Sequence, residues 1–276
     1  MIGQEHIWAY AQKLIDSGFP RFVILVGARG SGKTTFTREL CEALHYKLVS
    51  VGNTVDEVRE VIANSYRNTE PIVYVLTDTD KMSVAAKNAL LKVTEEPPQQ
   101  AYFIQTVTDL SNSLPTLVSR ACILKMDDYT YKELNQYLET KYPNHGLSED
   151  YVHFICETAS VPLEIDMLMS YDVPEFINLV HMTANNIHTV SGANCFKIEN
   201  KLALKKDEDK WDVVLFLQAL NLQLITLYYT TQQRPFFEAF KLVSQTIIDI
   251  KVKNSVNKQY CLDQLIIGIR KCWREE

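Results

Sequence analysis

The chain has 276 residues, of which 46% are hydrophobic, so it can bury a substantial core and form about two domains. Its formal net charge of −6 argues against a large, general nucleic-acid-binding surface, because such surfaces are rich in lysine and arginine. A local basic stripe inside an assembly remains compatible with that charge.

No apolar stretch comes near the ~18–20 residues of a transmembrane helix, and the N-terminus lacks a signal-peptide pattern, so we expect a soluble, cytoplasmic protein. The cysteines are scattered without a CxxC pair, and the histidines show no HExxH spacing. We therefore expect reduced core cysteines and no disulfide framework or zinc site. The six cysteines are Cys41, Cys122, Cys156, Cys195, Cys261 and Cys272.

Helix and strand patterns alternate over residues 1–126, which predicts a parallel sheet with helices on both sides. A T-x-x-E capping box at Thr54 and Glu57 marks the start of one helix. In chain order we expect a helix over 7–15, strands over 22–26 and 47–51 on either side of a helix over 33–44, the capped helix, a strand over 71–76, a helix through Ala86, Leu90 and Val93, and a strand over 102–106.

Strand signals fade after Met126. Thr130 and Glu133 form a second capping box, and two or three short helices should fill residues 130–172. From residue 173 the chain reads as helical to its end. The segment Leu215–Tyr229 is strongly apolar for a soluble helix, so we expect it to pack on several sides or against a partner subunit.

Residues 27–34 form a complete GxxxxGK[ST] phosphate-binding loop between the strand over 22–26 and the helix that follows. Its glycines let backbone N–H groups turn onto phosphate oxygens, and the helix N-terminus adds its positive dipole end. Lys33 would reach the β- and γ-phosphates, and the Thr34 hydroxyl would ligate Mg²⁺. The alternative is an ordinary glycine-rich turn. The candidate nucleotide contacts in this loop are Gly27, Ala28, Arg29, Gly30, Ser31, Gly32, Lys33, Thr34 and Thr35.

Four segments in order resemble the clamp-loader branch of the AAA+ ATPases, especially the gamma and delta-prime subunits of bacterial DNA polymerase III. The segment 88–92 (Asn-Ala-Leu-Leu-Lys), with Glu-Glu-Pro-Pro at 95–98, is the most specific match. The others are Ile2-Gly3-Gln4-Glu5, where the family's backbone lies beside the adenine, residues 55–60, and residues 114–120, which end in Ser119-Arg120.

This resemblance implies an AAA+ P-loop domain over 1–126, a helical lid over 127–172 and a helical collar for oligomerisation over 173–276. ATP and Mg²⁺ are the implied cofactors, with Ile2 beside the adenine. Zinc is not implied, because the chain passes from Leu44 directly to the next strand, where these subunits usually carry a four-cysteine module. The implied partners are other loader subunits in a hetero- or homo-oligomer, a sliding clamp and primed DNA contacted without sequence preference; no membrane is implied.

The second Walker motif departs from that of a hydrolytic motor. Aligned on the resemblance, Thr77 stands at the position of the Mg²⁺ aspartate and Asp78 at that of the glutamate that positions water. A slip of one residue would give Asp78 the metal role, but then Thr79 replaces the glutamate. The alternative is that Asp78 and Asp80 only cap the next helix near Met82 and Ser83.

The lid shows a second departure, because residues 159–164 lack the arginine that motor subunits of this family direct at the γ-phosphate. Arg120 matches the family's arginine finger, which acts on a neighbour's nucleotide; its alternative is a surface salt bridge. Thr108 lies near the family's polar sensor, with Thr106 as the competing choice.

The sequence therefore favours a clamp-loader subunit that binds ATP with weak or absent hydrolysis. The chain is a P-loop ATPase by motif only, so its status as an enzyme stays open. One alternative is an active Mg-ATPase motor in which Asp78 suffices, in a homo-oligomeric loader. A second is a nucleotide-insensitive stator, and a third is a branch-migration motor of DNA repair, which fits the Glu-Glu-Pro-Pro segment less well.

Overall fold

The computed structural model describes residues 2–186, 202, 210–252 and 257–273. The chain divides into two compact units. The first comprises residues 1–133 and 161–163, and the second comprises residues 134–160 and 164–276. The division of the sequence into three domains at 126 and 172 stays a prediction.

The first unit is built on a five-stranded parallel sheet with strand order β2-β3-β4-β1-β5. Every residue of β1 and of β4 is buried, because both strands lie inside the sheet and helices cover both of its faces. The strands are β1 (Phe22–Val26), β2 (Lys47–Val51), β3 (Ile72–Leu76), β4 (Ala101–Val107) and β5 (Cys122–Lys125).

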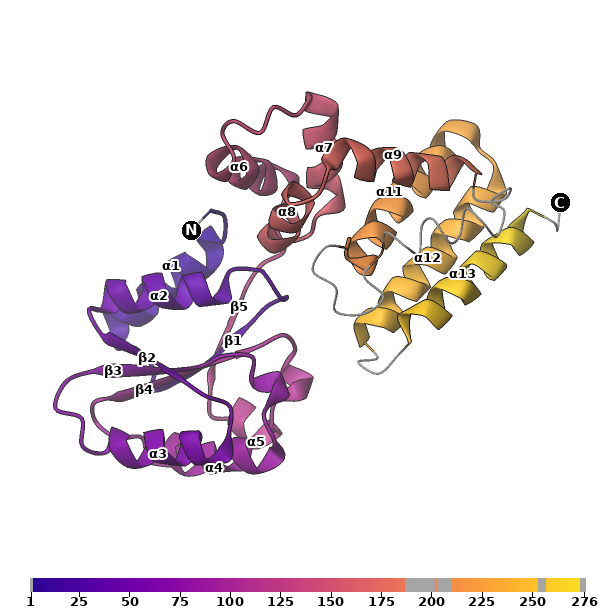
Figure 1. Cartoon of the computed structure of the whole chain (residues 1–276). Coiled ribbons are helices and arrows are strands. Elements are labelled where there is room, and N and C mark those ends of the chain that lie inside the picture. Colours follow the sequence, from indigo (N-terminus) through magenta and orange to yellow (C-terminus); the bar gives the residue numbers. More distant parts are fainter. Residues whose placement is uncertain (1, 187–201, 203–209, 253–256, 274–276) are drawn as a thin grey trace. The chain divides into compact units, whose positions relative to one another are not determined.

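Helices α1 and α2 cover one face of the sheet, and α3, α4 and α5 cover the other (Figure 1). Phe36 and Leu40 of α2 pack on the first face, and Ala86 and Leu90 of α4 pack on the second. These helices are α1 (Glu5–Ser17), α2 (Lys33–Leu44), α3 (Val55–Ser65), α4 (Val84–Glu95) and α5 (Pro115–Val118), with short 3-10 turns η1 (Thr79–Lys81) and η2 (Leu110–Asn112).

The predicted parallel sheet with helices on both faces is confirmed, and β1, β2 and α2 have the predicted bounds. Both capping boxes form: the Glu57 and Glu133 backbone N–H groups donate to the hydroxyls of Thr54 and Thr130. Strand β5 was not predicted. Its burial explains why, since only Leu124 of its four residues is buried and the strand lies at the sheet edge.

The second unit is helical, as predicted, in the part of it that the structure describes. An aspartate ties the first helices together: the Asp166 carboxylate accepts hydrogen bonds from the hydroxyls of Tyr137 and Tyr142 and from Lys141 Nζ at 2.7 Å. The helices are α6 (Tyr131–Lys141), which begins in the first unit, α7 (Glu149–Thr158), α8 (Pro162–Met169), α9 (Val173–Asn186), α11 (Val213–Thr231), α12 (Arg234–Val252) and α13 (Lys258–Cys272).

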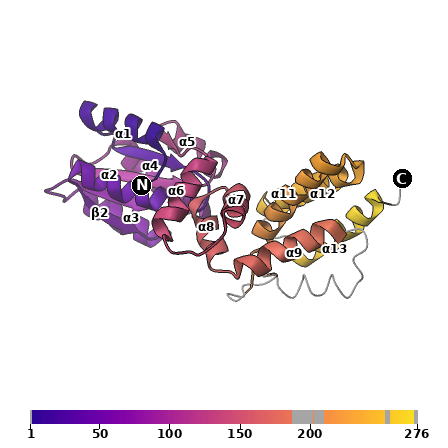
Figure 2. The same ribbon diagram turned by 90° about the horizontal axis from the view of Figure 1, so that it is seen from above.

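Helix α11 is the apolar helix expected over 215–229, and it packs against α7, α9 and α12. Figure 2 shows α11 and α12 side by side. The expectation that no stretch approaches a membrane span is wrong by length and composition, since the 19 residues of α11 are long and apolar enough to cross a bilayer. Core helices of soluble proteins meet the same criterion, so α11 is weak evidence for a membrane.

The cysteines only partly fit the predicted core role. Cys41 and Cys156 are buried, whereas Cys122, Cys261 and Cys272 are half-buried, and none of the five forms a disulfide with another described residue. Burial raises the pKa of both buried thiols to about 11, which leaves them as protonated packing residues. Cys195 lies outside the described residues.

We expect Phe103→Ala to destabilise the first unit by about 3–5 kcal/mol, because it removes a fully buried ring stacked on Tyr74 in the sheet core. Hydrogen–deuterium exchange of the β1 and β4 amides would measure this loss. Val84→Ala is the control, since Val84 is 65% exposed and its loss should change stability by less than about 0.5 kcal/mol. Equal effects of the two substitutions would contradict the assigned core.

Candidate functional site

The sheet brings the ends of β1, β4 and β3 to one edge. Strand β4 lies between the other two, with Val107 opposite Val26 and Gln105 opposite Leu76. In parallel sheets of this kind, ligands bind outside the carboxyl ends of the strands. The phosphate-loop sequence follows β1 at this edge, and the Thr-Asp-Thr-Asp run over 77–80 follows β3 there.

The phosphate loop has the backbone that its glycines permit. Gly30 and Gly32 have φ values of 83° and 92°, a left-handed conformation that other residues rarely adopt. A side chain at Gly27 would lie 2.7 Å from Met126 Cγ and 2.8 Å from Ser31 Oγ, and one at Gly30 would collide with Leu163. The loop is therefore packed closely, and α2 begins directly at its end with Lys33.

Lys33 is the buried cation of the site, with 8% of its surface exposed. Its Nζ donates hydrogen bonds to the carbonyls of Gly27 at 2.7 Å and Ala28 at 2.9 Å. Burial lowers the pKa of Lys33, while the negative charges of Asp78 and Asp80 act in the opposite direction. The strand ends after β1 and β3 thus share one electrostatic environment.

Apart from Ile2, the other residues predicted to contact the nucleotide lie on the loop or at the start of α2. Ser31 is buried, and its Oγ has no hydrogen-bond partner among the described residues. Ala28 and Arg29 are exposed at the loop, as is Thr34 on the first turn of α2, whereas Thr35 is half-buried. Ile2 is half-buried at the start of the described chain.

A segment just beyond β5 also contacts the loop. The Tyr129 hydroxyl donates to the Ser31 carbonyl at 2.8 Å, a contact that no sequence pattern indicated. Beside it, the buried Gln4 side chain forms two hydrogen bonds with the backbone of Asp127: Gln4 Nε2 donates to its carbonyl and Gln4 Oε1 accepts from its N–H, both at 2.8 Å. The residues next to Ile2 are thereby fixed to the end of the sheet.

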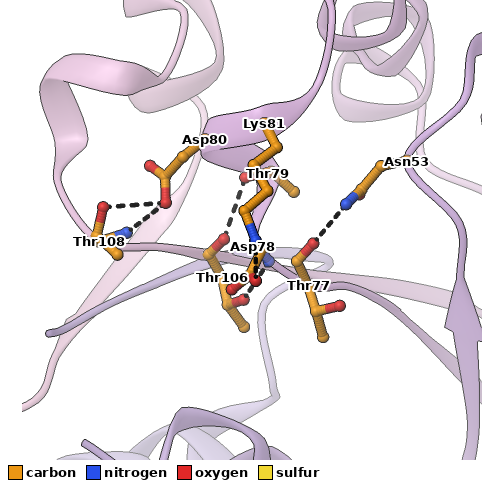
Figure 3. A network of polar contacts seen from close by, with 8 residues as sticks. All are labelled: Asn53, Thr77, Asp78, Thr79, Asp80, Lys81, Thr106 and Thr108. Carbon is orange, nitrogen blue, oxygen red and sulfur yellow. Dashed lines mark hydrogen bonds and ion pairs between the residues drawn. The ribbon is translucent and has the colours of Figure 1, made fainter. Parts of the chain in front are cut away.

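Figure 3 shows the polar turn after β3. The Thr77 carbonyl accepts a hydrogen bond from Asn53 Nδ2 at 2.9 Å. Asp78 has a left-handed backbone with φ of 52°, and its N–H donates to Thr106 Oγ1. The Asp78 carboxylate forms an exposed ion pair with Lys81 at 2.9 Å, and the hydrogen bond from Lys81 lowers the pKa of Asp78.

Asp80 points from the same turn to the end of β4 (Figure 3). Its Oδ2 accepts hydrogen bonds from the N–H of Thr108 at 2.9 Å and from Thr108 Oγ1 at 3.0 Å. Its Oδ1 is buried and has no hydrogen-bond partner among the described residues. The two candidate sensor threonines therefore differ, since Thr108 is exposed and bound to Asp80 while Thr106 is buried and holds the turn.

The capping alternative for the two aspartates is wrong, because Ser83 caps α4 and its hydroxyl accepts from the N–H of Ala86 at 3.2 Å. Asp78 makes no side-chain cap of η1 either. From the sequence, Asp80 was expected only as a helix cap. Its position four residues beyond a buried strand, at the edge where β4 also ends, was the signal for another role.

Arg120 contacts residues of α4 and α5 instead of the phosphate loop. Its guanidinium forms an ion pair with Glu95 at 2.8 Å and donates to the Thr116 carbonyl at 2.8 Å. Both partners of the ion pair are partly exposed, so it contributes little to stability. This is the geometry of the salt-bridge alternative; the arginine-finger role stays a prediction.

Within the described ranges, no group of three or more histidine, cysteine, aspartate or glutamate side chains is placed to hold a metal ion. The one carboxylate expected beside Mg²⁺ is that of Asp78, and the one hydroxyl is that of Thr34. The zinc-free state stays a prediction.

The parallel sheet, the helices on both faces and the phosphate loop at the end of β1, together with a helical C-terminal part, define an α/β fold of the AAA+ class. The chain is similar to RuvB, a Holliday-junction branch-migration motor from Thermotoga maritima, with a TM-score of 0.55 at 16% identity over 95% of this chain and 88% of that one. The chain is also similar to a DNA polymerase III gamma-subunit-related protein from Thermotoga maritima, with a TM-score of 0.50 and 14% identity. This match covers 96% of this chain and 98% of that one. These likenesses show the fold alone.

A family model described as DNA polymerase III, delta subunit, matches residues 45–130. The gamma subunit of DNA polymerase III from Buchnera aphidicola subsp. Schizaphis graminum is 25% identical over 73% of this chain and 63% of its own length. The tau subunit of DNA polymerase III from Bacillus subtilis is 27% identical over 44% of this chain and 27% of its own length. The chain thus spans less than two thirds of either relative. The family match and these relatives show that the chain is similar to clamp-loader subunits of DNA polymerase III.

We expect Asp78→Asn to lower the pKa of Lys33 further, because it removes a negative charge that raises this pKa. The Lys33 side-chain carbon shifts in an NMR titration of the nucleotide-free chain would report the change. Asp56→Asn, on an exposed position of α3, is the matched control and should leave Lys33 unchanged. If Asp78→Asn left the pKa of Lys33 unchanged, the proposed electrostatic effect of the turn after β3 on the phosphate loop would be contradicted.

Proposed function

We propose that this chain is a clamp-loader subunit of DNA replication that binds Mg-ATP through its phosphate loop, with weak or absent hydrolysis. It would supply Arg120 to the nucleotide of a neighbouring subunit. Together with other subunits it would open a sliding clamp and place it on primed DNA, in the cytoplasm. The names of its relatives and its AAA+ fold support this proposal.

The observation that carries the proposal is an intact phosphate cradle beside a strand end that lacks the usual acidic pair. Lys33 lies buried on the loop carbonyls, where its ammonium could turn to the β- and γ-phosphates. The N-terminus of α2 adds unpaired N–H groups and a positive dipole end. Ser31 Oγ is buried and has no hydrogen-bond partner in the described part of the chain, so it is a further polar group that can bind a ligand. The residues present therefore fit a nucleotide phosphate.

The same edge fits rapid hydrolysis poorly. Thr77 offers no carboxylate at the end of β3, and its carbonyl is held by Asn53. Asp78 is one methylene shorter than glutamate and is engaged by Lys81, and a misplacement of about 1 Å can lower a rate roughly 100-fold. Leu163, an apolar side chain, lies against Gly30 in the segment where motors of the resembled family carry an arginine.

Thr34 and Asp78 are the residues that would hold Mg²⁺, which would neutralise phosphate charge when bound. Thr34 is exposed on the first turn of α2, so its hydroxyl is accessible to a hydrated ion. Asp78 would have to exchange its bond with Lys81 for the ion. This exchange is accessible because the Asp78 and Lys81 side chains are 53% and 73% exposed.

An active Mg-ATPase is the second candidate function, and the charge of Asp78 on Lys33 favours it. Asp78 would then replace both missing acidic residues. Steady-state turnover by the purified chain that disappears in Lys33→Ala would support this candidate and would contradict the non-hydrolysing form of the first.

We expect Lys33→Ala to abolish Mg-ATP binding by the purified chain, because it removes the only described cation that the phosphate loop holds against its carbonyls. Isothermal titration calorimetry with micromolar Mg-ATP would measure the loss. Lys13→Ala, at an exposed site on α1, is the control and should leave the affinity unchanged. If the unaltered chain did not bind Mg-ATP, the nucleotide-binding part of the proposal would be contradicted.

We expect Arg120→Ala to slow ATP turnover by the isolated clamp-loading complex on the order of 10³-fold, the typical contribution of an arginine finger. The affinity of this chain for Mg-ATP should stay the same. Glu95→Gln is the control, because it breaks the resting ion pair and leaves the guanidinium available. Equal turnover in the Arg120→Ala and unaltered complexes would leave Arg120 as a surface salt bridge.

A further inference from the structure

Thr108 lies directly beside the base of the phosphate loop. The N–H of Gly27, the first loop residue, donates to the carbonyl of Val107 at 3.1 Å. Val107 also lies opposite Val26 in the register of β1 and β4. Thr108 directly follows the last residue of β4, so it lies at the same edge of the sheet as the loop.

This edge also carries the residue expected to contact the terminal phosphate. Lys33 is the residue of the motif that reaches the β- and γ-phosphates. The negative charge of Asp80 raises the pKa of Lys33, and the Asp80 carboxylate accepts a hydrogen bond from Thr108, so the threonine shares the electrostatic environment of Lys33. A threonine hydroxyl with its proton free would, at this edge, be able to favour a nucleotide with a γ-phosphate.

The Thr108 hydroxyl, however, has already used its proton. A threonine hydroxyl carries one proton and two lone pairs, and here the proton is donated to Asp80 Oδ2 at 3.0 Å. The N–H of Thr108 donates to the same oxygen at 2.9 Å, so both donors of the residue converge on one carboxylate (Figure 3). Hydrogen bonds to an ionised acceptor are the stronger kind.

The contact is not shared with other groups of the turn. Asp78 is held by Lys81 and Thr106, and Thr79 by Gln105 and Thr106, so the turn has anchors apart from Asp80. No described residue other than Thr108 donates a hydrogen bond to the Asp80 carboxylate. Asp80 is therefore available to Thr108 alone.

We propose that Asp80 is a positioning residue that holds the hydroxyl proton of Thr108, so that this hydroxyl adds nothing to the preference of the site for ATP over ADP. Phosphate oxygens only accept hydrogen bonds, and a hydroxyl whose proton is committed offers them only lone pairs. This inference rests on the proposed nucleotide binding. It adds that any discrimination between the two nucleotides comes from the other groups of the site, such as Lys33.

The test is calorimetric binding of Mg-ATP and Mg-ADP to the full chain. The ratio of the two affinities in the unaltered chain is the reference for the variants. Asp80→Ala should release the Thr108 hydroxyl to donate to the γ-phosphate and raise the preference for ATP about tenfold, the value of one hydrogen bond to a charged acceptor. Thr108→Val should leave the preference of the unaltered chain unchanged, and the double variant should lose the gain.

Two further variants separate the hydrogen bond from charge. Asp80→Asn keeps an acceptor oxygen for the Thr108 hydroxyl, so the preference should stay at its unaltered value. Asp109→Ala removes an exposed neighbouring charge that accepts a hydrogen bond from the N–H of Ser111. It should also leave the preference for ATP unchanged. A gain in Asp80→Asn as large as that in Asp80→Ala would assign the effect to charge and overturn the inference.

A readout without nucleotide checks the resting geometry. In NMR spectra of the free chain, the Thr108 amide proton should move upfield in Asp80→Ala, because the charged acceptor of that amide is gone. An unmoved Thr108 amide, or a preference for ATP that Thr108→Val lowers, would overturn the inference while nucleotide binding stands. Failure of the unaltered chain to bind either nucleotide would instead overturn the proposed function, and the inference with it.

Discussion

The placement of β4 between β1 and β3 is the constraint on which the candidate site depends. The register of its hydrogen bonds determines where the ends of β1 and β3 lie along the sheet. The hydrogen bond from the Gly27 N–H to the Val107 carbonyl then positions the start of the phosphate loop against β4. The turn after β3 is aligned by the same strand, through Thr106. Because every residue of β4 is buried, its position is fixed by packing on both faces and not by the polar groups it orders.

Burial and charge have opposite effects on the ionisation of Lys33 in this site. Burial disfavours the charged form of Lys33, while two loop carbonyls and the charges of Asp78 and Asp80 favour it. A cation kept charged in a closely packed loop is prepared for an anionic ligand without further rearrangement of the backbone. The turn after β3 lacks such preparation, because the exposed carboxylate of Asp78 is paired with Lys81.

The sequence predicted the elements whose signals are local. The bounds of β1, β2 and α2 follow from continuous apolar runs and a motif, and the capping boxes involve residues three apart. It did not predict β5, whose stability comes from pairing with β1 and not from its own burial. The roles of Asp80 and Tyr129 were also missed, since their partners lie 28 and 98 residues away in the chain. Only the strand register brings such residues together.

The paired hydrogen bonds between Gln4 and Asp127 connect residues 123 positions apart, at opposite ends of the α/β unit. Gln4 cannot form these bonds until Asp127 has been synthesised, so the start of the chain waits for the last strand of the unit. Closing so long a loop also costs conformational entropy, which the two hydrogen bonds and the packing around them must offset. During synthesis, a nascent chain therefore completes the segment beside its phosphate loop only after all five strands have been made.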